Sequence, residues 1–191
     1  MEDQEAVRRL RQGDIGGLES LVQRYQLQAV HVAYLITREQ AIAEDVVQDA
    51  FLQAYRRIEQ FDMNRPFGPW FLRIVANNAV KAMRRDKKQI ALSQHNGDRQ
   101  PDRADTLATQ CIDNPELLFE RAETSEAVLS ALDGLSPAQR AVIVQKYYLD
   151  MSEAEMVAAS GSAPGTIKWH LHRARKRLQA LLGGLNPQDQ R

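Results

Sequence analysis

The sequence predicts an all-α protein, in which two helical domains are joined by a flexible linker and the C-terminal domain carries a helix-turn-helix. Three observations support this fold class. Apolar residues recur at helical spacing on both sides of a central polar stretch. That stretch, from about Ser93 to Pro115, is free of aromatic residues and has the composition of a linker. No strand-like alternation of useful length interrupts the helical pattern.

The first domain is predicted to span residues 1–90, with a helical pattern from Ile15 to about Lys88. The clearest apolar face comprises Val47, Phe51, Ala54 and Ile58. A break is expected from Phe61 to Pro66, and another apolar face begins at Phe67.

The linker is predicted at residues 91–116 and the second domain at residues 117–185. Two capping boxes mark helix starts in this second domain. Ser136 precedes Pro137 at a first helical position, with Gln139 three residues after the serine. Ser152 and Glu155 repeat the same spacing.

The segment from Ser152 to Leu182 predicts the helix-turn-helix. Gly161 suits the left-handed conformation that ends a helix, and Pro164 suits the first turn of the next one. One apolar stripe of that second helix comprises Ile167, Leu171, Ala174, Leu178 and Leu182. Its remaining surface is basic, which favours contact with DNA phosphates, although basic helices also suit membranes or partner proteins.

Composition excludes several classes of protein. The chain has 191 residues, a formal net charge of +0 and one cysteine, Cys111, so a disulfide framework and a cysteine-rich metal site are excluded within it. The four histidines are too scattered for a metal site, and no common catalytic motif is present. We therefore expect no metal, no cofactor and no enzymatic activity. With no secretory signal and no membrane-spanning run, a cytoplasmic location without membrane insertion is expected.

Two features of the first domain have alternative interpretations. Asp45, Gln48 and Asp49 share one exposed helix face, which spacing alone explains as acid near a helix N-terminus. An aromatic and then basic segment follows from Pro66 to Lys88. Its aromatic residues suit a core, whereas rings beside amides and cations also form single-stranded nucleic-acid sites.

Several separated motifs, in order, resemble those of the group IV bacterial sigma factors of the sigma-70 family, the extracytoplasmic-function (ECF) type. Residues 43–55 (AEDVVQDAFLQAY) resemble the family's polymerase-binding helix, and residues 67–77 (FGPWFLRIVAN) resemble its promoter-melting segment. Residues 135–140 (LSPAQR) and 165–178 (GTIKWHLHRARKRL) are similar to its region four. The resemblance covers the chain except the linker and the two ends.

The resemblance implies a non-enzymatic promoter-specificity subunit of RNA polymerase, with core polymerase (beta and beta-prime subunits), promoter DNA and an anti-sigma factor as partners. The residues implied to bind core polymerase are Glu44, Asp45, Gln48 and Asp49. Those implied to bind the unwound minus-ten element are Trp70, Arg73, Asn77, Asn78, Arg84, Arg85 and Lys88. Those implied to bind the minus-thirty-five element are Gly165, Thr166, Lys168, Trp169, His172, Arg173 and Lys176.

The chain departs from the family pattern in places. Residues 162–164 (SAP) replace a frequent Ile-Pro-Val, Trp169 and His170 replace a frequent Ser-Arg pair, and Lys81 replaces an Asp. These departures indicate altered packing or promoter preference. Two other functions remain open from the residues: a helix-turn-helix regulator that acts without core polymerase, and a helical adaptor that binds only protein.

Overall fold

The computed structural model describes residues 3–93 and 126–183, with side chains described up to residue 85 in the first range. Regular structure in these ranges is helical throughout, which confirms the predicted all-α class. The helices are α1 (Asp3–Arg11), α2 (Gly16–Thr37), α3 (Gln40–Arg56), η1 (Ile58–Gln60), α4 (Phe67–Ser93), α6 (Pro137–Ile143), η2 (Val144–Tyr148), α7 (Glu153–Ser160) and α8 (Pro164–Leu182). Residues 126–133 form a further helix.

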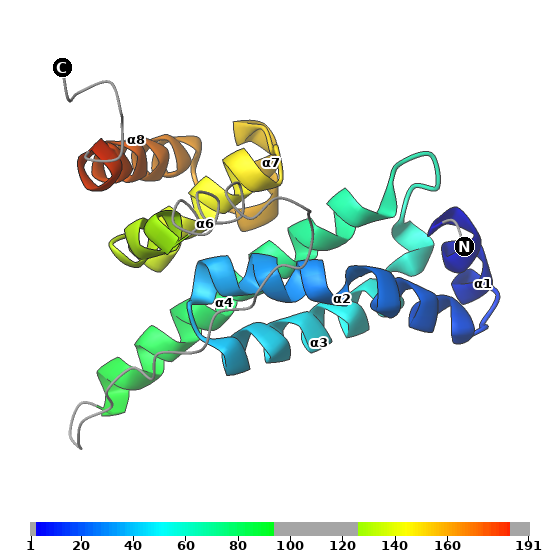
Figure 1. Cartoon of the computed structure of the whole chain (residues 1–191). Helices are drawn as coiled ribbons and strands as arrows, with labels where there is room; N and C mark the ends of the chain where they lie inside the picture. The colour runs from blue at the N-terminus through cyan, green and yellow to red at the C-terminus, as the bar shows by residue number, and fades with distance from the viewer. Residues whose placement is uncertain (1–2, 94–125, 184–191) are drawn as a thin grey trace, which may run out of the picture.

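The N-terminal helices, α1 to α4, pack as a bundle in which α2, α3 and α4 contact one another and α1 covers one end of α2 (Figure 1). The predicted apolar face of α3 and η1 is buried, as expected. Phe51 and Phe71 pack with ring centroids 4.3 Å apart, and Phe67 lies 5.6 Å from Phe71. Apolar burial of this kind is the main stabilising contribution to a helical bundle.

Arg11 of α1 binds the main chain around η1, before the start of α4. The Arg11 guanidinium donates to the main-chain oxygens of Ile58 at 3.1 Å and Glu59 at 3.2 Å, and also to that of Phe61. Ile58 and Glu59 belong to η1, and Phe61 is the first residue of the predicted break before α4. Close packing of α1 on α2 depends on Gly17, where an added Cβ would lie only 2.3 Å from the Ala6 carbonyl oxygen.

Both predicted capping boxes are confirmed in the C-terminal helices, which comprise residues 126–133, α6, η2, α7 and α8. The Ser152 hydroxyl accepts from the Glu155 N–H at 3.2 Å, while the Glu155 carboxylate accepts from the Ser152 N–H at 2.8 Å. Ser136 and Gln139 make the equivalent pair at the start of α6. Gly161 ends α7 at φ +64°, and α8 begins with Pro164, as predicted.

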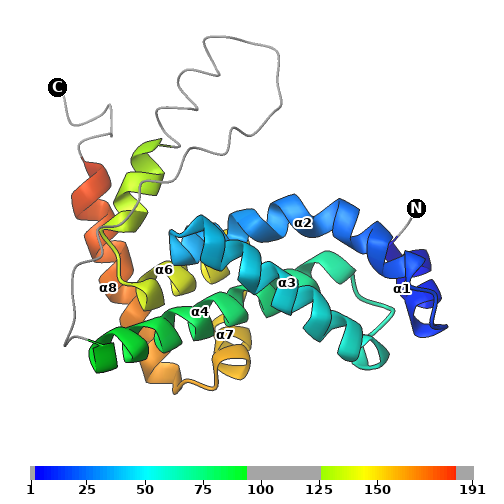
Figure 2. The ribbon, with the colours of Figure 1, turned by 90° about the horizontal axis from the view of Figure 1, so that it is seen from below.

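The C-terminal helices dock on the N-terminal helices, with α6 against α2 and α4, and α7 against α4 (Figures 1 and 2). Leu132, Leu135 and Ala141 belong to the same buried apolar cluster as the core of the N-terminal helices. The α4 helix continues to Ser93, so residues 91–93, predicted to open the linker, are helical. The rest of the predicted linker up to residue 116 lies outside the described residues.

Candidate nucleic-acid and protein interfaces

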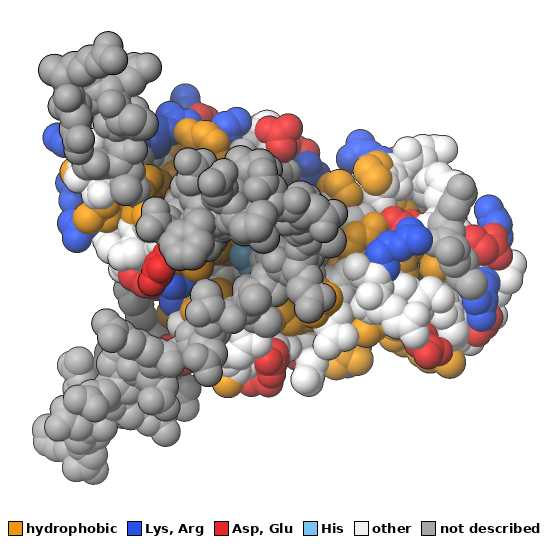
Figure 3. Space-filling view, in the orientation of Figure 1, with side chains coloured by type: hydrophobic (Ala, Val, Ile, Leu, Met, Phe, Trp, Pro, Cys, Tyr) orange, Lys and Arg blue, Asp and Glu red, His pale blue; other side chains and the backbone are white. Residues whose placement is uncertain are grey.

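The exposed face of α8 carries the predicted duplex-reading side chains. Lys168, Trp169, His172, Arg173 and Lys176 are all exposed. The predicted stripe opposite them packs inward, with Ile167, Leu171 and Ala174 buried. Lys and Arg side chains gather over the α8 end of the molecule in Figure 3. An exposed cationic face on the second helix of a helix-turn-helix is suited to a DNA groove.

The start of α8 differs in one detail from the expectation. The Thr166 N–H donates to the main-chain oxygen of Ala163 at 2.9 Å, so it is already engaged in the first turn. A phosphate contact at this helix end is therefore left to the Gly165 N–H and the Thr166 hydroxyl, both on exposed residues.

Trp169 is an exposed aromatic residue of α8 that lies beside a cation. Its side chain is 54% exposed, and the Arg173 guanidinium lies 5.3 Å from its ring centroid. Six residues further along α8, Arg175 donates from Nε to the Tyr147 hydroxyl at 2.8 Å, which joins α8 to η2. A large ring beside a cation, on a helix held by its neighbours, can contact base edges or sugar.

The acidic face of α3 is exposed, as its spacing predicts. Glu44, Asp45, Gln48 and Asp49 are all exposed, while Val46 and Val47 between them are buried. Glu44 accepts a hydrogen bond from Gln40 at 2.6 Å. All four side chains are exposed on the surface, where an ionic partner can reach them.

Beside this face, α2 and α3 enclose a wide groove of about 1110 Å³. Glu44 and Gln48 line it together with apolar side chains, among them Val22, Phe51 and Leu52. Leu27 on its α2 wall is 80% exposed and Leu52 is 52% exposed. Exposed apolar surface rimmed by acid is typical of a protein-binding site. Sequence reasoning missed this apolar component, because Leu27 and Leu52 look like ordinary members of helical stripes.

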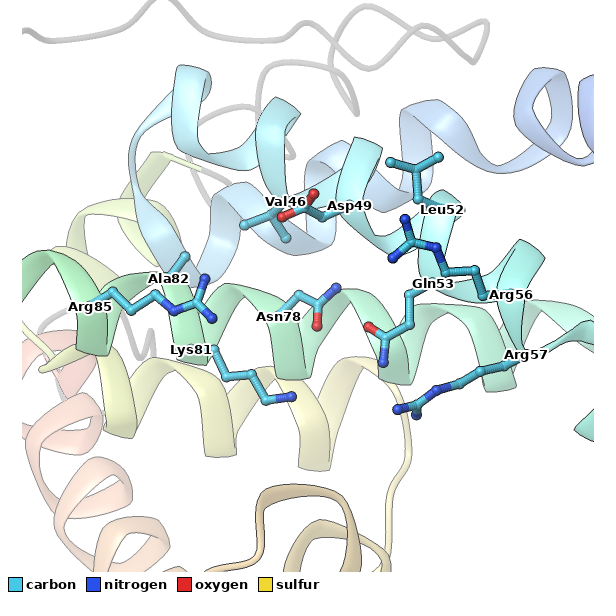
Figure 4. A pocket seen from close by; sticks show the side chains of 10 residues that line it. All are labelled: Val46, Asp49, Leu52, Gln53, Arg56, Arg57, Asn78, Lys81, Ala82 and Arg85. Carbon is cyan, nitrogen blue, oxygen red and sulfur yellow. The ribbon is translucent and has the colours of Figure 1, made fainter.

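The α4 residues predicted to bind the minus-ten strand divide between two faces. Asn78 and Arg85 line a pocket of about 490 Å³ between α3 and α4, together with Asp49 (Figure 4). The other cationic side chains of this pocket are Arg56, Arg57 and Lys81. Figure 4 shows these groups projecting from both helices toward one space. The cations outnumber the single carboxylate, so the pocket favours an anion such as a phosphate.

The second face of α4 meets the C-terminal helices. Arg73 forms an ion pair with Glu155 at 2.7 Å, and Asn77 accepts a hydrogen bond from Gln145 at 3.3 Å. Arg84 lies near His170, whose pKa is lowered from its usual value first by burial and then by the Arg84 charge. Arg73 and Asn77 are thus engaged within the chain, whereas Arg84 remains exposed.

Trp70 and Lys88 complete the predicted minus-ten set. Trp70 is partly buried, with its ring 5.0 Å from that of Phe61 and 5.5 Å from that of Phe67. Trp70 therefore belongs to the aromatic core, and part of its side chain remains exposed. Lys88 lies on α4, but its side chain is outside those described.

The contacts that join the two groups of helices had no signal in the sequence. Arg38 and Asp133 form a bidentate pair at 2.6 and 3.1 Å. Arg140, 7% exposed, donates to the Ile36 main-chain oxygen at 2.8 Å. In the sequence, Arg38 and Arg140 look like ordinary surface charges in helical segments. Their partners are distant in the chain, so no local pattern indicates these contacts.

Two segments of the chain match known protein families. Residues 21–89 match the family described as Sigma-70 region 2, and residues 125–178 match Sigma-70, region 4. The first match contains α3 and nearly all of α4, and the second contains the helix-turn-helix up to residue 178 of α8. The two matches define the chain as a transcription-initiation factor of the sigma-70 type.

Two individual relatives show which group of sigma-70 factors the chain resembles. ECF RNA polymerase sigma factor SigM of Mycobacterium tuberculosis (strain ATCC 25618 / H37Rv) is 32% identical over 174 residues, covering 91% of this chain and 81% of the relative. ECF RNA polymerase sigma factor SigW of Bacillus subtilis (strain 168) is 28% identical over 182 residues, covering 94% and 96%. The chain belongs to the ECF RNA polymerase sigma factors, which confirms the resemblance. Its function is that of an RNA polymerase sigma factor.

A solved structure has a similar fold across most of the chain. The sigma factor RpoE of Bartonella quintana, in complex with the anti-sigma factor NepR, aligns with a TM-score of 0.61 and 25% identity. The alignment covers 86% of this chain and 96% of that one. Among helices in the described part of the chain, none has the length and apolarity needed to cross a membrane.

Proposed function

We propose that the acidic face of α3 and the groove beside it bind core RNA polymerase, at its beta-prime subunit. The observation that carries this assignment is the combination of exposed Asp45, Gln48 and Asp49 with exposed apolar Leu52 on one helix. Charged groups steer a basic partner and set its orientation, while the apolar groove supplies burial. The sigma factor acts as a binding subunit and performs no catalysis itself.

The two DNA surfaces then divide promoter recognition. The α4 helix holds the unwound minus-ten strand, with Arg73 and Asn77 near the bases and Arg84, Arg85 and Lys88 along the backbone. The α8 helix reads the minus-thirty-five duplex with its exposed face. The C-terminal helices also bind the polymerase beta subunit, and the linker sets the distance between the two DNA modules.

An anti-sigma factor is the expected regulator of this chain in the cytoplasm. A relative of similar fold, RpoE, has been solved with the anti-sigma factor NepR. CnrH, at a TM-score of 0.56 and 26% identity, has been solved with the cytosolic domain of CnrY. The groove between α2 and α3 suits an apolar segment of the anti-sigma factor, because Leu27 and Leu52 are exposed there.

The test is transcription in vitro with purified core polymerase on a library of genomic promoter fragments. We expect the full chain to co-purify with core polymerase and to start transcription at a defined subset of fragments. A chain that binds promoter fragments but never core polymerase would overturn the proposal in favour of a regulator that acts alone. A chain that binds neither would indicate a protein-only adaptor.

A further inference from the structure

Three departures of this chain from the sigma-70 pattern meet in one pocket of the folded molecule. Lys81 stands where an Asp is usual, Ser162 where an Ile is frequent, and His170 where an Arg is frequent. All three line a pocket of about 60 Å³ between α4 and the C-terminal helices, which we call the interface pocket. Departures in separate segments that converge on one space indicate that this space has a use of its own.

The walls of the interface pocket come from both groups of helices. The α4 helix supplies Lys81 and Arg84, while α7, the following turn and α8 supply Ser160, Ser162 and His170. Figure 2 shows α6 and α7 lying beside α4. The volume gives room for roughly two water molecules or one small tetrahedral ion. The pocket is therefore sized for a single ion.

The interface pocket is rich in hydrogen-bond donors. Lys81 and Arg84 are cations, and the hydroxyls of Ser160 and Ser162 can donate as well. The Ser160 oxygen already accepts from the Ser162 N–H at 3.2 Å, which leaves the Ser160 hydroxyl to act as a donor. Among the described residues that line the pocket there is no carboxylate. Positive charge without an acid to offset it favours an anion.

His170 brings a buried polar atom to the interface pocket. Its ring Nδ1 is buried and makes no hydrogen bond within the described part of the chain. Burial, followed by the Arg84 charge, lowers the pKa of His170 from its ordinary value. An anion beside both groups would offset this repulsion and accept a hydrogen bond from the ring.

Apolar neighbours strengthen the interactions of a charge at this place. Ala141, Val142 and Ile167 are buried and belong to the same lining. Charges attract more strongly beside apolar walls than in open water, because the effective dielectric constant is lower there. The interface pocket thus combines cations, hydroxyl donors and a surface that excludes water.

We propose that the interface pocket binds a small tetrahedral oxyanion of the phosphate class, held by Lys81, Arg84, His170 and the Ser162 hydroxyl. Because α4 and the turn between α7 and α8 both contact the ion, its binding stabilises the packing of these helices by linkage. Of the four residues, only Arg84 is also assigned to DNA. The site therefore stands independently of the proposed minus-ten contacts.

The test is NMR of the histidine ring signals of the full chain during titration with inorganic phosphate, at constant pH and ionic strength. We expect the His170 signals to move along a saturating curve at millimolar phosphate. His31 is the internal reference, because the described lining of its groove contains no Lys or Arg, so its signals should stay in place. An equal movement with chloride, or a straight line without saturation, would overturn the proposal.

Two variants test the pocket and keep His170 as the reporter. Lys81→Gln removes the charge of an exposed side chain, and Ser162→Ile restores the residue that is frequent in the family and occupies the pocket with an apolar group. Each should weaken phosphate binding about tenfold, because a charge-assisted hydrogen bond or the space for the ion is lost. Thermal unfolding verifies that both variants are folded. Unchanged affinity in both would contradict the site.

Arg56→Gln is the matched control for the other basic pocket. Arg56 lines the pocket between α3 and α4 but not the interface pocket, whereas Lys81 borders both. The His170 response should therefore be the same in Arg56→Gln as in the unaltered chain. Equal weakening in Arg56→Gln and Lys81→Gln would place the ion between α3 and α4 and overturn the proposal.

Adenosine monophosphate separates the free ion from a phosphate ester. The pocket has room for one ion, so the nucleotide should move the His170 signals much less than phosphate does at the same concentration. An equal response to the nucleotide would place the ligand on an open cationic surface and reject the interface pocket. These measurements need neither polymerase nor promoter DNA, so their failure is distinct from a failure of the proposed function.

Discussion

Arg140 donates from its guanidinium Nε to the main-chain oxygen of Ile36 at 2.8 Å, joining residues 104 positions apart. Ile36 lies in the last turn of α2, where carbonyl oxygens have no partner within the helix. A cation at this end also interacts favourably with the helix dipole. The Arg140 side chain of α6 thus supplies a hydrogen-bond donor that the end of α2 lacks. The stability of the N-terminal helices is therefore linked to docking of the C-terminal helices.

Replacement of Arg140 by methionine should destabilise the protein by about 1–3 kcal/mol, because the Ile36 oxygen is left buried without a partner. Urea unfolding followed by circular dichroism measures this change. The control is Arg65→Met, since Arg65 is exposed and its ion pair with Asp62 spans 3.5 Å, and a change within about 0.5 kcal/mol is expected. Equal losses in the two variants would contradict a capping role for Arg140.

Asp45→Arg should weaken binding to core polymerase by about tenfold or more, since a charge of the wrong sign would face a basic partner. The thermal midpoint should hardly change, because Asp45 is exposed. The affinity is measured by binding each variant to surface-immobilised core polymerase. Glu19→Arg on α2 is the matched control, because it reverses an exposed charge outside the acidic face of α3 and should leave the affinity unchanged. Unchanged affinity for Asp45→Arg would place the polymerase contact elsewhere.

Lys176→Ala should lower the slope of log affinity against log salt by about one unit for duplex DNA, because one phosphate contact is lost. Titrations at several salt concentrations give the slope. Arg8→Ala removes the same charge from α1, where Arg8 pairs with Glu5, and should leave the slope unchanged. A slope that stays constant in Lys176→Ala removes this residue from the phosphate contacts.

Trp169→Ser should change which minus-thirty-five sequences are preferred, with little effect on stability, since the ring is 54% exposed. Selection from a randomised duplex library with polymerase holoenzyme measures the preference. Trp169→Phe, which keeps an aromatic ring beside Arg173, should shift it less. Identical selected sequences in all three proteins would show that Trp169 takes no part in base readout.

Stability should fall as the pH drops below about 6.5, the ordinary pKa of histidine. Burial lowers the pKa of His31, and burial together with Arg84 lowers that of His170. The folded state therefore binds fewer protons than the unfolded chain, so this contribution is complete above pH 6.5 and is lost as the pH falls through the folded pKa values.

Urea unfolding at about pH 7.5 and about pH 5.5 measures this loss. His31→Gln and His170→Gln should each reduce the difference between the two conditions. A difference that persists unchanged in both histidine variants would mean that other groups govern the response.

Local signals predicted several helix boundaries, chiefly among the C-terminal helices. Ser136 and Ser152 begin α6 and α7 through the capping boxes that their sequences indicate, and Gly161 ends α7 with the expected left-handed backbone. Such features depend on a few neighbouring residues, which is why sequence reveals them. The exposure of Asp45 and Trp169 followed in the same way from helical spacing.

Docking could not be predicted, because it depends on partners far apart in the chain. Nothing near Arg73 indicates that Glu155 will face it, and Glu155 already has a sufficient local role as a capping residue. The sequence placed the α4 candidates in one continuous site, whereas the structure turns Asn77 toward Gln145 and Asn78 toward α3. Adjacent residues on a helix point about 100° apart, so each meets a different neighbour.

Asp49 belongs both to the acidic face of α3 and to the wall of the basic pocket between α3 and α4. A cation of core polymerase that pairs with Asp49 would neutralise the carboxylate that offsets Arg56, Lys81 and Arg85 in that pocket. The pocket would then attract the DNA backbone more strongly. Because such coupling is reciprocal, promoter DNA held there would tighten the hold of polymerase by the same factor, so one side chain makes the two binding events cooperative.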